Sequence, residues 1–289
     1  LKFSKRLNID LMIGTSITIT HVSFFTKIPS IIFDDDDDDV QPLMVKFAYP
    51  FATNILSPDC LRNIRKNNKT IFYPSYHELS YLHPNRFKPD RNILNEIGLK
   101  KDEKFFVLRF NSFEAHHDIG VTGVSLKNKK KLISFLKKYG KVFITTEKEI
   151  EDEFKQFQLK ISSEKIHSLL YYAHIFIGDS QTMSSEAAML GTPSIRSNSL
   201  VGKISYLDEQ EKKYKLTYGF LPKDFDDLIL KLNAMLNNFN LKEDWRIKRD
   251  FMINQKIDST AFFLWFIENY PKSVKLTKNE TEFWGKYKN

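Results

Sequence analysis

A run of polar residues with the spacing of an anion site follows the apolar stretch at 175–177. The segment reads GDSQTMSSEAAMLGTP at 178–193, and Ser180 is a good N-cap for a helix predicted over 181–190. The first backbone amides of a helix lack an acceptor within the helix, and the helix dipole favours negative charge beside them. The spacing therefore predicts a phosphate site made by Ser180, Gln181 and Thr182.

Glu186 lies one turn beyond Thr182 on the same face of that helix. It is too deep in the helix for a capping box, which needs an acid at the third helical position. A carboxylate at this place can accept both hydroxyl groups of a ribose. The alternative is an ordinary capped helix whose Glu186 is solvated. Because the turn lacks the glycines of a dinucleotide-binding loop, its pattern is less specific than that motif.

Six consecutive aspartates occupy 34–39, directly after the strand-like run PSIIF. Asp34 and Asp35 come first after the strand, where ligands meet parallel sheets, so they are our candidates for a general base. The alternatives are a solvated acidic loop and a divalent metal held by several carboxylates. We predict neither a metal site nor a cofactor.

Three further side chains are candidates for the same kind of edge. His116 and His117, in FEAHHDIGVTG, follow a predicted strand by a few residues and can shuttle a proton or donate to phosphate. Arg109 ends that strand and can contact a diphosphate or pair with a local carboxylate. We expect His167 and His174, in contrast, to be packing or capping residues.

Strand-like runs alternate with helix-length segments along the chain, which predicts an α/β protein with parallel sheets. The predicted strands lie at 10–13, 29–33, 55–57, 69–73, 104–109, 141–145, 175–177 and 193–195. The predicted helices lie at 18–27, 127–139, 166–173, 181–190, 224–237 and 258–270. The proline-containing stretch at 73–90 predicts a connection between domains. We expect domains at 1–99 and 100–250, and a helical segment at 251–289 that packs back on the first.

Composition excludes several classes of protein. The chain has 289 residues, a formal net charge of +8 and one cysteine, Cys60. Scattered charge without a zinc or RNA-recognition motif argues against nucleic acid, and a single cysteine fits the reducing cytoplasm. No apolar run is long enough to span a membrane, although a weak attraction to the inner face of an anionic membrane stays open. The polar start at Leu1 predicts a first domain truncated at its N-terminus.

Four stretches resemble an uncharacterised prokaryotic family, domain of unknown function 354. They are FDDDDDDVQP, YHELSYLHPNRFKPD, VLRFNSFEAHHDIGVTGVS and KIHSLLYYAHIFIGDSQTMSSEAAMLGTPSIR, and the resemblance covers roughly 9–220. This family is similar to the GT-B enzymes, which include nucleotide-sugar glycosyltransferases and UDP-N-acetylglucosamine 2-epimerases. The resemblance implies two Rossmann-like domains with parallel sheets facing across a cleft. It also implies a diphosphate on the amides at 180–182, a ribose on Glu186, and no required metal.

Two departures from the epimerases bear on the reaction. The epimerases have a glycine pair where this chain has Gln181 and Thr182, so the phosphates lie less close to the backbone here. Their catalytic GDT is replaced by GTS at 14–16, and Thr15 cannot act as a general acid or base. Their catalytic glutamate is replaced by the shorter Asp34 and Asp35. Gly14, Thr15 and Ser16 therefore remain only as substrate-binding candidates.

These observations favour a glycosyltransferase over an epimerase. We expect it to move a sugar from a nucleotide-diphosphate donor, UDP-linked in our interpretation, to a glycan or lipid-linked acceptor in polysaccharide assembly. The alternatives are a nucleotide-sugar 2-epimerase and a binding protein that kept the nucleotide site without the chemistry.

Overall fold

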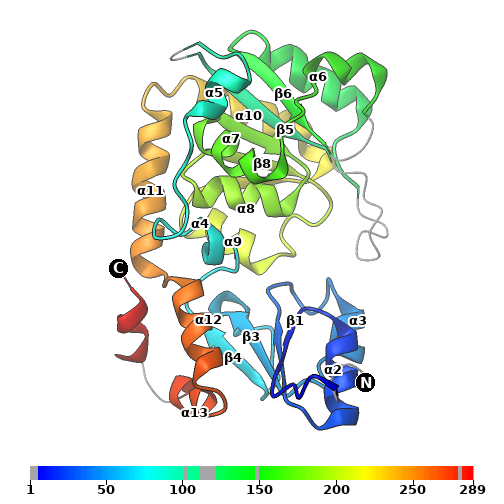
Figure 1. Cartoon of the computed structure of the whole chain (residues 1–289). Helices are drawn as coiled ribbons and strands as arrows, with labels where there is room; N and C mark the ends of the chain where they lie inside the picture. The colour runs from blue at the N-terminus through cyan, green and yellow to red at the C-terminus, as the bar shows by residue number, and fades with distance from the viewer. Residues whose placement is uncertain (1–5, 101–102, 111–121, 147–149, 279–281, 289) are drawn as a thin grey trace. The chain divides into compact units, whose positions relative to one another are not determined.

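The computed structural model describes residues 6–100, 103–110, 122–146, 150–278 and 282–288 (Figure 1). Their contacts divide the chain into two compact units. Unit 1 lies within Leu1–Ser80, Lys203–Tyr206 and Asn254–Asn289, and unit 2 within Tyr81–Gly202 and Leu207–Ile253. The division after residue 80 comes earlier than the boundary at 99 expected from sequence.

Unit 1 contains a parallel sheet of β1 (Met12–Gly14), β2 (Ser30–Phe33), β3 (Asn54–Pro58) and β4 (Thr70–Tyr73), in that spatial order. Parallel pairing places the ends of β1 and β2 side by side, with Gly14 opposite Ile32. Helix α2 (Ile17–Thr26) begins at Ser16, whose hydroxyl accepts a hydrogen bond from the Thr18 amide at 3.2 Å. The short helix α3 (Pro42–Phe47) starts with a proline at its first position, where the missing N–H costs nothing.

The sheet of unit 1 is buried on both faces because successive side chains of a strand point to opposite sides. Ile31 of β2 packs with Phe262 and Phe266 of α12 (Ser259–Glu268), while Ile32 packs with Ala48 and neighbouring residues that follow α3. The C-terminal elements α13 (Lys272–Lys278) and η6 (Glu282–Tyr287) also belong to unit 1. The segment from residue 254 onward thus supplies much of the core of the first sheet.

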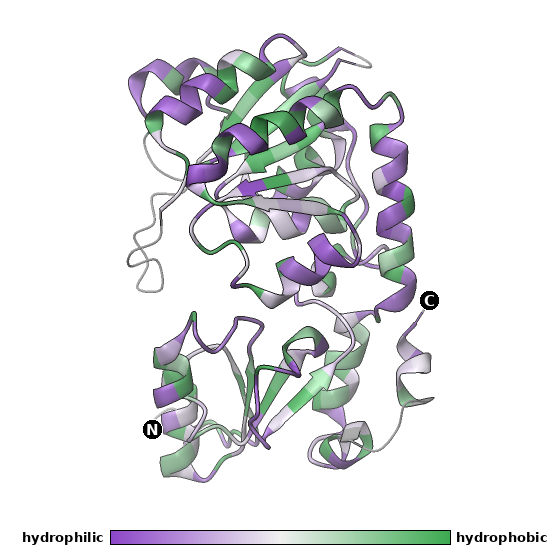
Figure 2. Cartoon of the chain, turned by 180° about the vertical axis from the view of Figure 1, so that it is seen from behind, coloured by the Kyte–Doolittle hydropathy of each residue, from purple (hydrophilic) through white to green (hydrophobic). Residues whose placement is uncertain are grey.

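Unit 2 contains a parallel sheet in the order β6-β5-β7-β8-β9. Hydrophobic residues are concentrated on the strands of both sheets (Figure 2). The strands are β5 (Phe105–Arg109), β6 (Lys141–Thr145), β7 (Ile175–Gly178), β8 (Ser194–Ser197) and β9 (Thr217–Phe220). The helices are α5 (Asn92–Glu96), α6 (Leu126–Leu136), α7 (Ile166–Tyr172), α8 (Gln181–Met189), α9 (Ser205–Lys212), α10 (Phe225–Leu236) and α11 (Leu241–Gln255). Two of them cross the division between the units: α9 begins in unit 1, and α11 ends in it.

The predicted strands and helices are present within a few residues of their expected bounds, but several elements were missed. Among them are α3, α5, α9, α11 and the edge strand β9. The 73–90 stretch is not all loop, since α4 (Leu79–Leu82) lies within it and Leu79 and Leu82 are buried. Within the described residues, no helix has the length and apolar character needed to cross a bilayer.

Candidate functional site

The turn between β7 and α8 is held by backbone contacts. A side chain on Gly178 would place its Cβ 2.3 Å from the Arg109 carbonyl oxygen, so only glycine lets β7 end this close to β5. The Asp179 amide donates to the same carbonyl at 3.1 Å. Ser180 is the N-cap of α8, as predicted, and its hydroxyl accepts from the Met183 amide at 3.3 Å. Helix geometry leaves the amides of Gln181 and Thr182 without an acceptor in the helix.

Asn198, which follows β8, supports this turn, and sequence reasoning missed it. Its side chain is fully buried after β8, and its Nδ2 donates to the Asp179 carbonyl oxygen at 2.8 Å. Its Oδ1 accepts from the Leu200 amide at 2.9 Å. Asn198 therefore fixes the turn of the neighbouring strand. A buried asparagine directly after a strand was the only available signal.

A cavity of about 500 Å³ opens beside this turn in unit 2. Of the predicted residues, Arg109, Ser180, Thr182 and Glu186 line it, while the side chain of Gln181 does not. The remaining lining residues are the apolar Leu159, Ile161, Ile166 and Met183 and the hydroxyl-bearing Thr145, Thr146, Ser162 and Ser163. The cavity therefore combines one cation, one carboxylate and a helix start with a partly apolar wall.

Glu186 is buried, with 7% of its surface exposed, so the solvated alternative is wrong. Its Oε1 accepts hydrogen bonds from the Tyr81 hydroxyl and from His167 Nε2, each at 3.0 Å. The expectation that His167 is a packing or capping residue is confirmed by its ring contacts with Tyr81 and Phe87, and its ring nitrogen also holds this carboxylate. The same expectation is confirmed for His174, which packs against Phe106 with ring centroids 5.8 Å apart.

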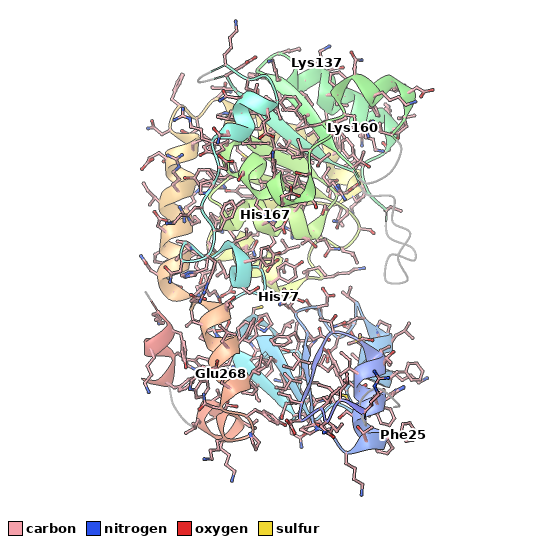
Figure 3. All side chains as sticks on the ribbon, in the orientation of Figure 1. Phe25, His77, Lys137, Lys160, His167 and Glu268 are labelled. Atoms are coloured by element: carbon pink, nitrogen blue, oxygen red, sulfur yellow. The ribbon has the colours of Figure 1, made fainter. Side chains whose placement is uncertain are left out.

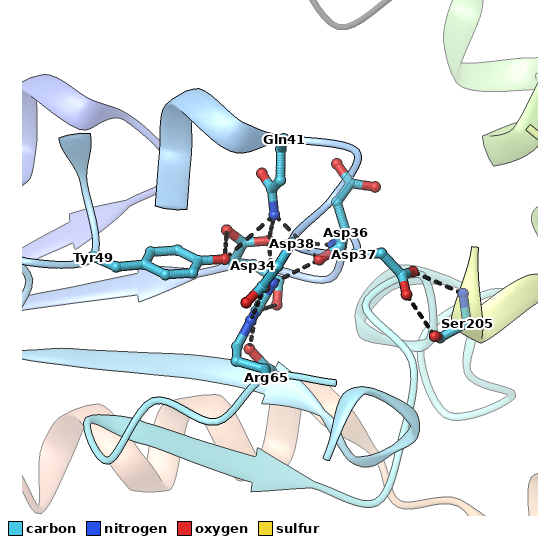
Figure 4. Close-up of polar contacts among 9 residues, drawn as sticks. Asp34, Asp36, Asp37, Asp38, Gln41, Tyr49, Arg65 and Ser205 are labelled. Atoms are coloured by element: carbon cyan, nitrogen blue, oxygen red, sulfur yellow. Dashed lines mark hydrogen bonds and ion pairs between the residues drawn. The ribbon is translucent and has the colours of Figure 1, made fainter. Parts of the chain in front are cut away.

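In unit 1 the acidic run is organised around a buried arginine, Arg65 (Figure 4). Its Nε donates to Asp38 Oδ1 at 2.8 Å, and its Nη2 donates to the Asp36 carbonyl oxygen at 2.6 Å and lies 3.4 Å from Asp34 Oδ1. Burial acts to lower the pKa of Arg65, but the charges of Asp34 and Asp38 outweigh it and the pKa is raised. Sequence reasoning missed Arg65, which lies far along the chain from the aspartates.

The aspartate run is not a solvated loop throughout, because Asp34 and Asp37 are buried. Asp34 Oδ2 accepts from the Tyr49 hydroxyl at 2.8 Å, and Oδ1 accepts from Gln41 Nε2. Asp37 accepts from the amide and the hydroxyl of Ser205, the first residue of α9, at 2.7 and 2.6 Å. Both oxygens of Asp34 are thus occupied, which argues against Asp34 as a general base and fits a role in holding the loop.

Asp35 differs from its neighbour because no hydrogen bond from a described side chain reaches its half-buried carboxylate. Burial is the largest influence on the pKa of Asp35 and raises it; nearby His77 opposes the rise and Asp34 adds to it. A carboxylate with a raised pKa is a stronger base once deprotonated. Of the two predicted aspartates, Asp35 is the one available for proton transfer.

The other candidates from the sequence lie apart from these contacts. Thr15 and Ser16 are exposed at the carboxyl end of β1, next to the end of β2. His116 and His117 fall outside the described residues. Among the residues that the structure does describe, no three His, Cys, Asp or Glu side chains are grouped as metal ligands would be.

The two parallel sheets and their helices define an α/β protein with a GT-B-like fold, as the comparisons with solved structures show. Similar structures include MnaA from S. aureus with UDP (TM-score 0.61, 11% identity, 95% of this chain and 79% of that chain). Also similar is a UDP-GlcNAc 2-epimerase from Methanocaldococcus jannaschii (TM-score 0.58, 15% identity, 86% of this chain and 79% of that chain). A third is the spinosyn forosaminyltransferase SpnP (TM-score 0.60, 11% identity, 96% of this chain and 79% of that chain). Residues 5–244 match the family described as Protein of unknown function (DUF354), and the chain belongs to that family. A search of curated proteins found no match.

Proposed function

We propose that this protein is a glycosyltransferase that uses a nucleotide-diphosphate sugar, with UDP as the first nucleotide to test. The main support is the cavity of unit 2, which is lined by Arg109, the start of α8 and the buried Glu186. Proteins that share the fold support this, because one was solved with UDP and another is named as a sugar transferase.

In this proposal unit 2 binds the donor. The free amides of Gln181 and Thr182 and the guanidinium of Arg109 hold the diphosphate, whose negative charge grows as the sugar leaves. Glu186 accepts a hydrogen bond from the ribose. The apolar residues Leu159 and Ile161 offer a wall for the base.

Unit 1 supplies the base. Asp35 takes a proton from the acceptor hydroxyl, while Asp34, held by Tyr49 and Arg65, keeps the loop in place. A base must be deprotonated to act, and burial raises the pKa of Asp35. Turnover is therefore expected to rise with pH, with a midpoint above that of an ordinary aspartate.

The direct test combines binding and turnover. Calorimetry with UDP, and release of nucleoside diphosphate from a panel of sugar nucleotides and glycan or lipid-linked acceptors, should both give a signal. Glu186→Gln should weaken UDP binding about tenfold or more, since a hydrogen bond to a charged acceptor contributes about 1.5 to 3 kcal/mol. Neither binding nor release with any of these ligands would reject the proposal.

The two other functions give different results in the same assays. An epimerase, favoured by the fold similarity to UDP-GlcNAc 2-epimerases, would incorporate solvent deuterium next to the anomeric carbon without releasing nucleotide. A binding protein would be stabilised by UDP, but Asp35→Asn would change nothing measurable.

We also propose a cytoplasmic location with contact to the inner membrane surface, where lipid-linked acceptors would be found. Two neighbouring segments of unit 1 support it: Phe24 and Phe25 of α2 are 58% and 72% exposed, and Phe47 of α3 is 41% exposed. Figure 3 shows Phe25 pointing outward from α2. Neither helix contains an acidic residue, whereas Lys27 and Lys46 are exposed beside the aromatic rings. Exposed aromatic residues with a basic rim fit an anionic bilayer surface.

A further inference from the structure

The carboxylate of Glu186 presents one oxygen to the protein and leaves the other to the cavity. Oε1 receives both hydrogen bonds, from Tyr81 and from His167 at 3.0 Å each. Within the described part of the chain no group donates to Oε2, and the side chain lines the cavity. The expected contact between Glu186 and the hydroxyl groups of a ribose is therefore limited to Oε2.

The two donors on Oε1 are themselves fixed by ring packing. The Tyr81 and His167 rings lie 5.4 Å apart with an interplanar angle of 34°, and Phe87 meets His167 edge-on with centroids 6.0 Å apart. Because a carboxylate oxygen acts as the acceptor in this contact, His167 Nε2 is the nitrogen that donates to it. Two rigid donors on one oxygen restrict rotation of the carboxylate group, so Oε2 keeps a constant direction.

We propose that Tyr81 and His167 are positioning residues that make Glu186 a selector for ribonucleotides over 2′,3′-dideoxyribonucleotides. The inference rests on the proposed function, since it requires a nucleotide in this cavity. A ribose hydroxyl donates to Oε2 and completes the hydrogen bonds of a buried charge. A 2′,3′-dideoxyribose at the same place leaves Oε2 buried without a donor, which is costly because the carboxylate has lost its water.

The size of this selection follows from the strength of a hydrogen bond to a charged acceptor. We expect the native protein to bind a ribonucleoside diphosphate about 10 to 100 times more tightly than its 2′,3′-dideoxy form. Without Tyr81 and His167 the carboxylate can turn and recover water, so either ligand is tolerated. Selection then falls although the diphosphate contacts at the start of α8 are unchanged.

The experiment is calorimetry on the full chain with UDP, GDP, ADP and CDP, each paired with its 2′,3′-dideoxy form, and with pyrophosphate. Tyr81→Phe and His167→Leu should each lower the ribo-to-dideoxy ratio about threefold or more, and the double variant should bring it near 1. Pyrophosphate affinity should stay within about twofold, because it reports only the phosphate contacts. His167→Gln keeps an N–H donor and should restore most of the ratio.

The matched control is Tyr172→Phe, which removes a tyrosine hydroxyl from α7 without touching Glu186. It should leave the ratio unchanged, and thermal melting should show that all variants remain folded. An unchanged ratio in both Tyr81→Phe and His167→Leu, or no preference in the native protein, would overturn the inference while leaving nucleotide binding intact. If no nucleotide binds the native protein, the inference and the proposed function fall together.

Discussion

In unit 1, Arg65 is surrounded by oxygens from the aspartate run, whereas in unit 2 the turn after β7 is held by a glycine, an N-cap and Asn198. In the first region most of the carboxylates are bound within the protein, since Asp34, Asp37 and Asp38 all accept hydrogen bonds from other residues. In the second, Ser180, Thr182 and Glu186 line a cavity, and helix geometry leaves the first amides of α8 without an acceptor in the helix. A dense group of charges can thus have a structural role, while a turn with few charged side chains can still bind a ligand.

The physical basis of this difference is hydrogen-bond satisfaction. Buried carboxylates are stable only when paired or fully hydrogen-bonded, so adjacent aspartates near a sheet need an internal cation. Because Arg65 binds oxygens of the aspartate run, few of these oxygens remain for proton transfer. Asp35 is the exception. Backbone amides at a helix start keep their donor capacity without any such partner.

The largest expected effect is on the stability of unit 1. Arg65→Met leaves buried carboxylates without their cation and should lower the free energy of unfolding by about 3 to 5 kcal/mol. Urea unfolding measures the loss, and hydrogen exchange should rise in peptides covering β2 and β3 but not β7. Arg62→Met is the control, because Arg62 is exposed and its guanidinium stacks on Phe72 rather than meeting the aspartate run. An equal rise of hydrogen exchange in both units would contradict the assignment of Arg65 to the stability of unit 1.

The next effect separates two adjacent aspartates. Asp35→Asn should lower kcat at least about 100-fold, or about 3 kcal/mol, with the affinity for the donor unchanged, because it removes only the base. Asp34→Asn should instead lower stability, since the amide cannot accept from both Tyr49 and Arg65 in the same way. Turnover assays and urea unfolding on both variants measure this. Loss of turnover in the Asp34 variant alone would reverse the assignment.

A smaller, pH-dependent effect is expected in unit 2. Burial, with Lys104 and Lys242 nearby, lowers the pKa of His174 to about 4. Since the unfolded chain binds this proton near pH 6.5, stability is complete above that pH and is lost as the pH falls toward 4. Allowing for partial solvent screening, the loss is about 2 kcal/mol. His174→Phe should remove this part of the acid sensitivity in urea unfolding at pH 7 and pH 5, and an unchanged difference would refute it.

The smallest expected change in stability comes from the aromatic face of unit 1. Phe24→Ser with Phe25→Ser should alter the free energy of unfolding by no more than about 0.5 kcal/mol, because both rings are exposed. Cosedimentation with vesicles containing anionic lipid should nevertheless decrease several-fold. Phe239→Ser, which removes an exposed ring from unit 2, is the control and should leave it unchanged. No binding of the native chain to such vesicles would end the membrane proposal.

Much of the fold and part of the site followed from local sequence. Short apolar runs predicted the buried strands, and Ser180 predicted the start of α8, because capping and burial depend on neighbouring residues. The edge strand β9 and helix α11 were missed, since TYGF is short and α11 has a largely charged surface. Glu186 was found by its helical spacing. Its partners Tyr81 and His167 were not, because they reach it from other elements.

The sequence by itself determined the order of strands and helices, the capped turn at Ser180 and the family to which the chain belongs. Only the tertiary structure decided that both oxygens of Asp34 accept hydrogen bonds while Asp35 receives none from a described side chain, and that Tyr81 and His167 both donate to the same oxygen of Glu186. The reason is that secondary structure depends on residues a few positions apart. The availability of a charged group depends on donors such as Arg65, Tyr81 and His167, which only folding brings near.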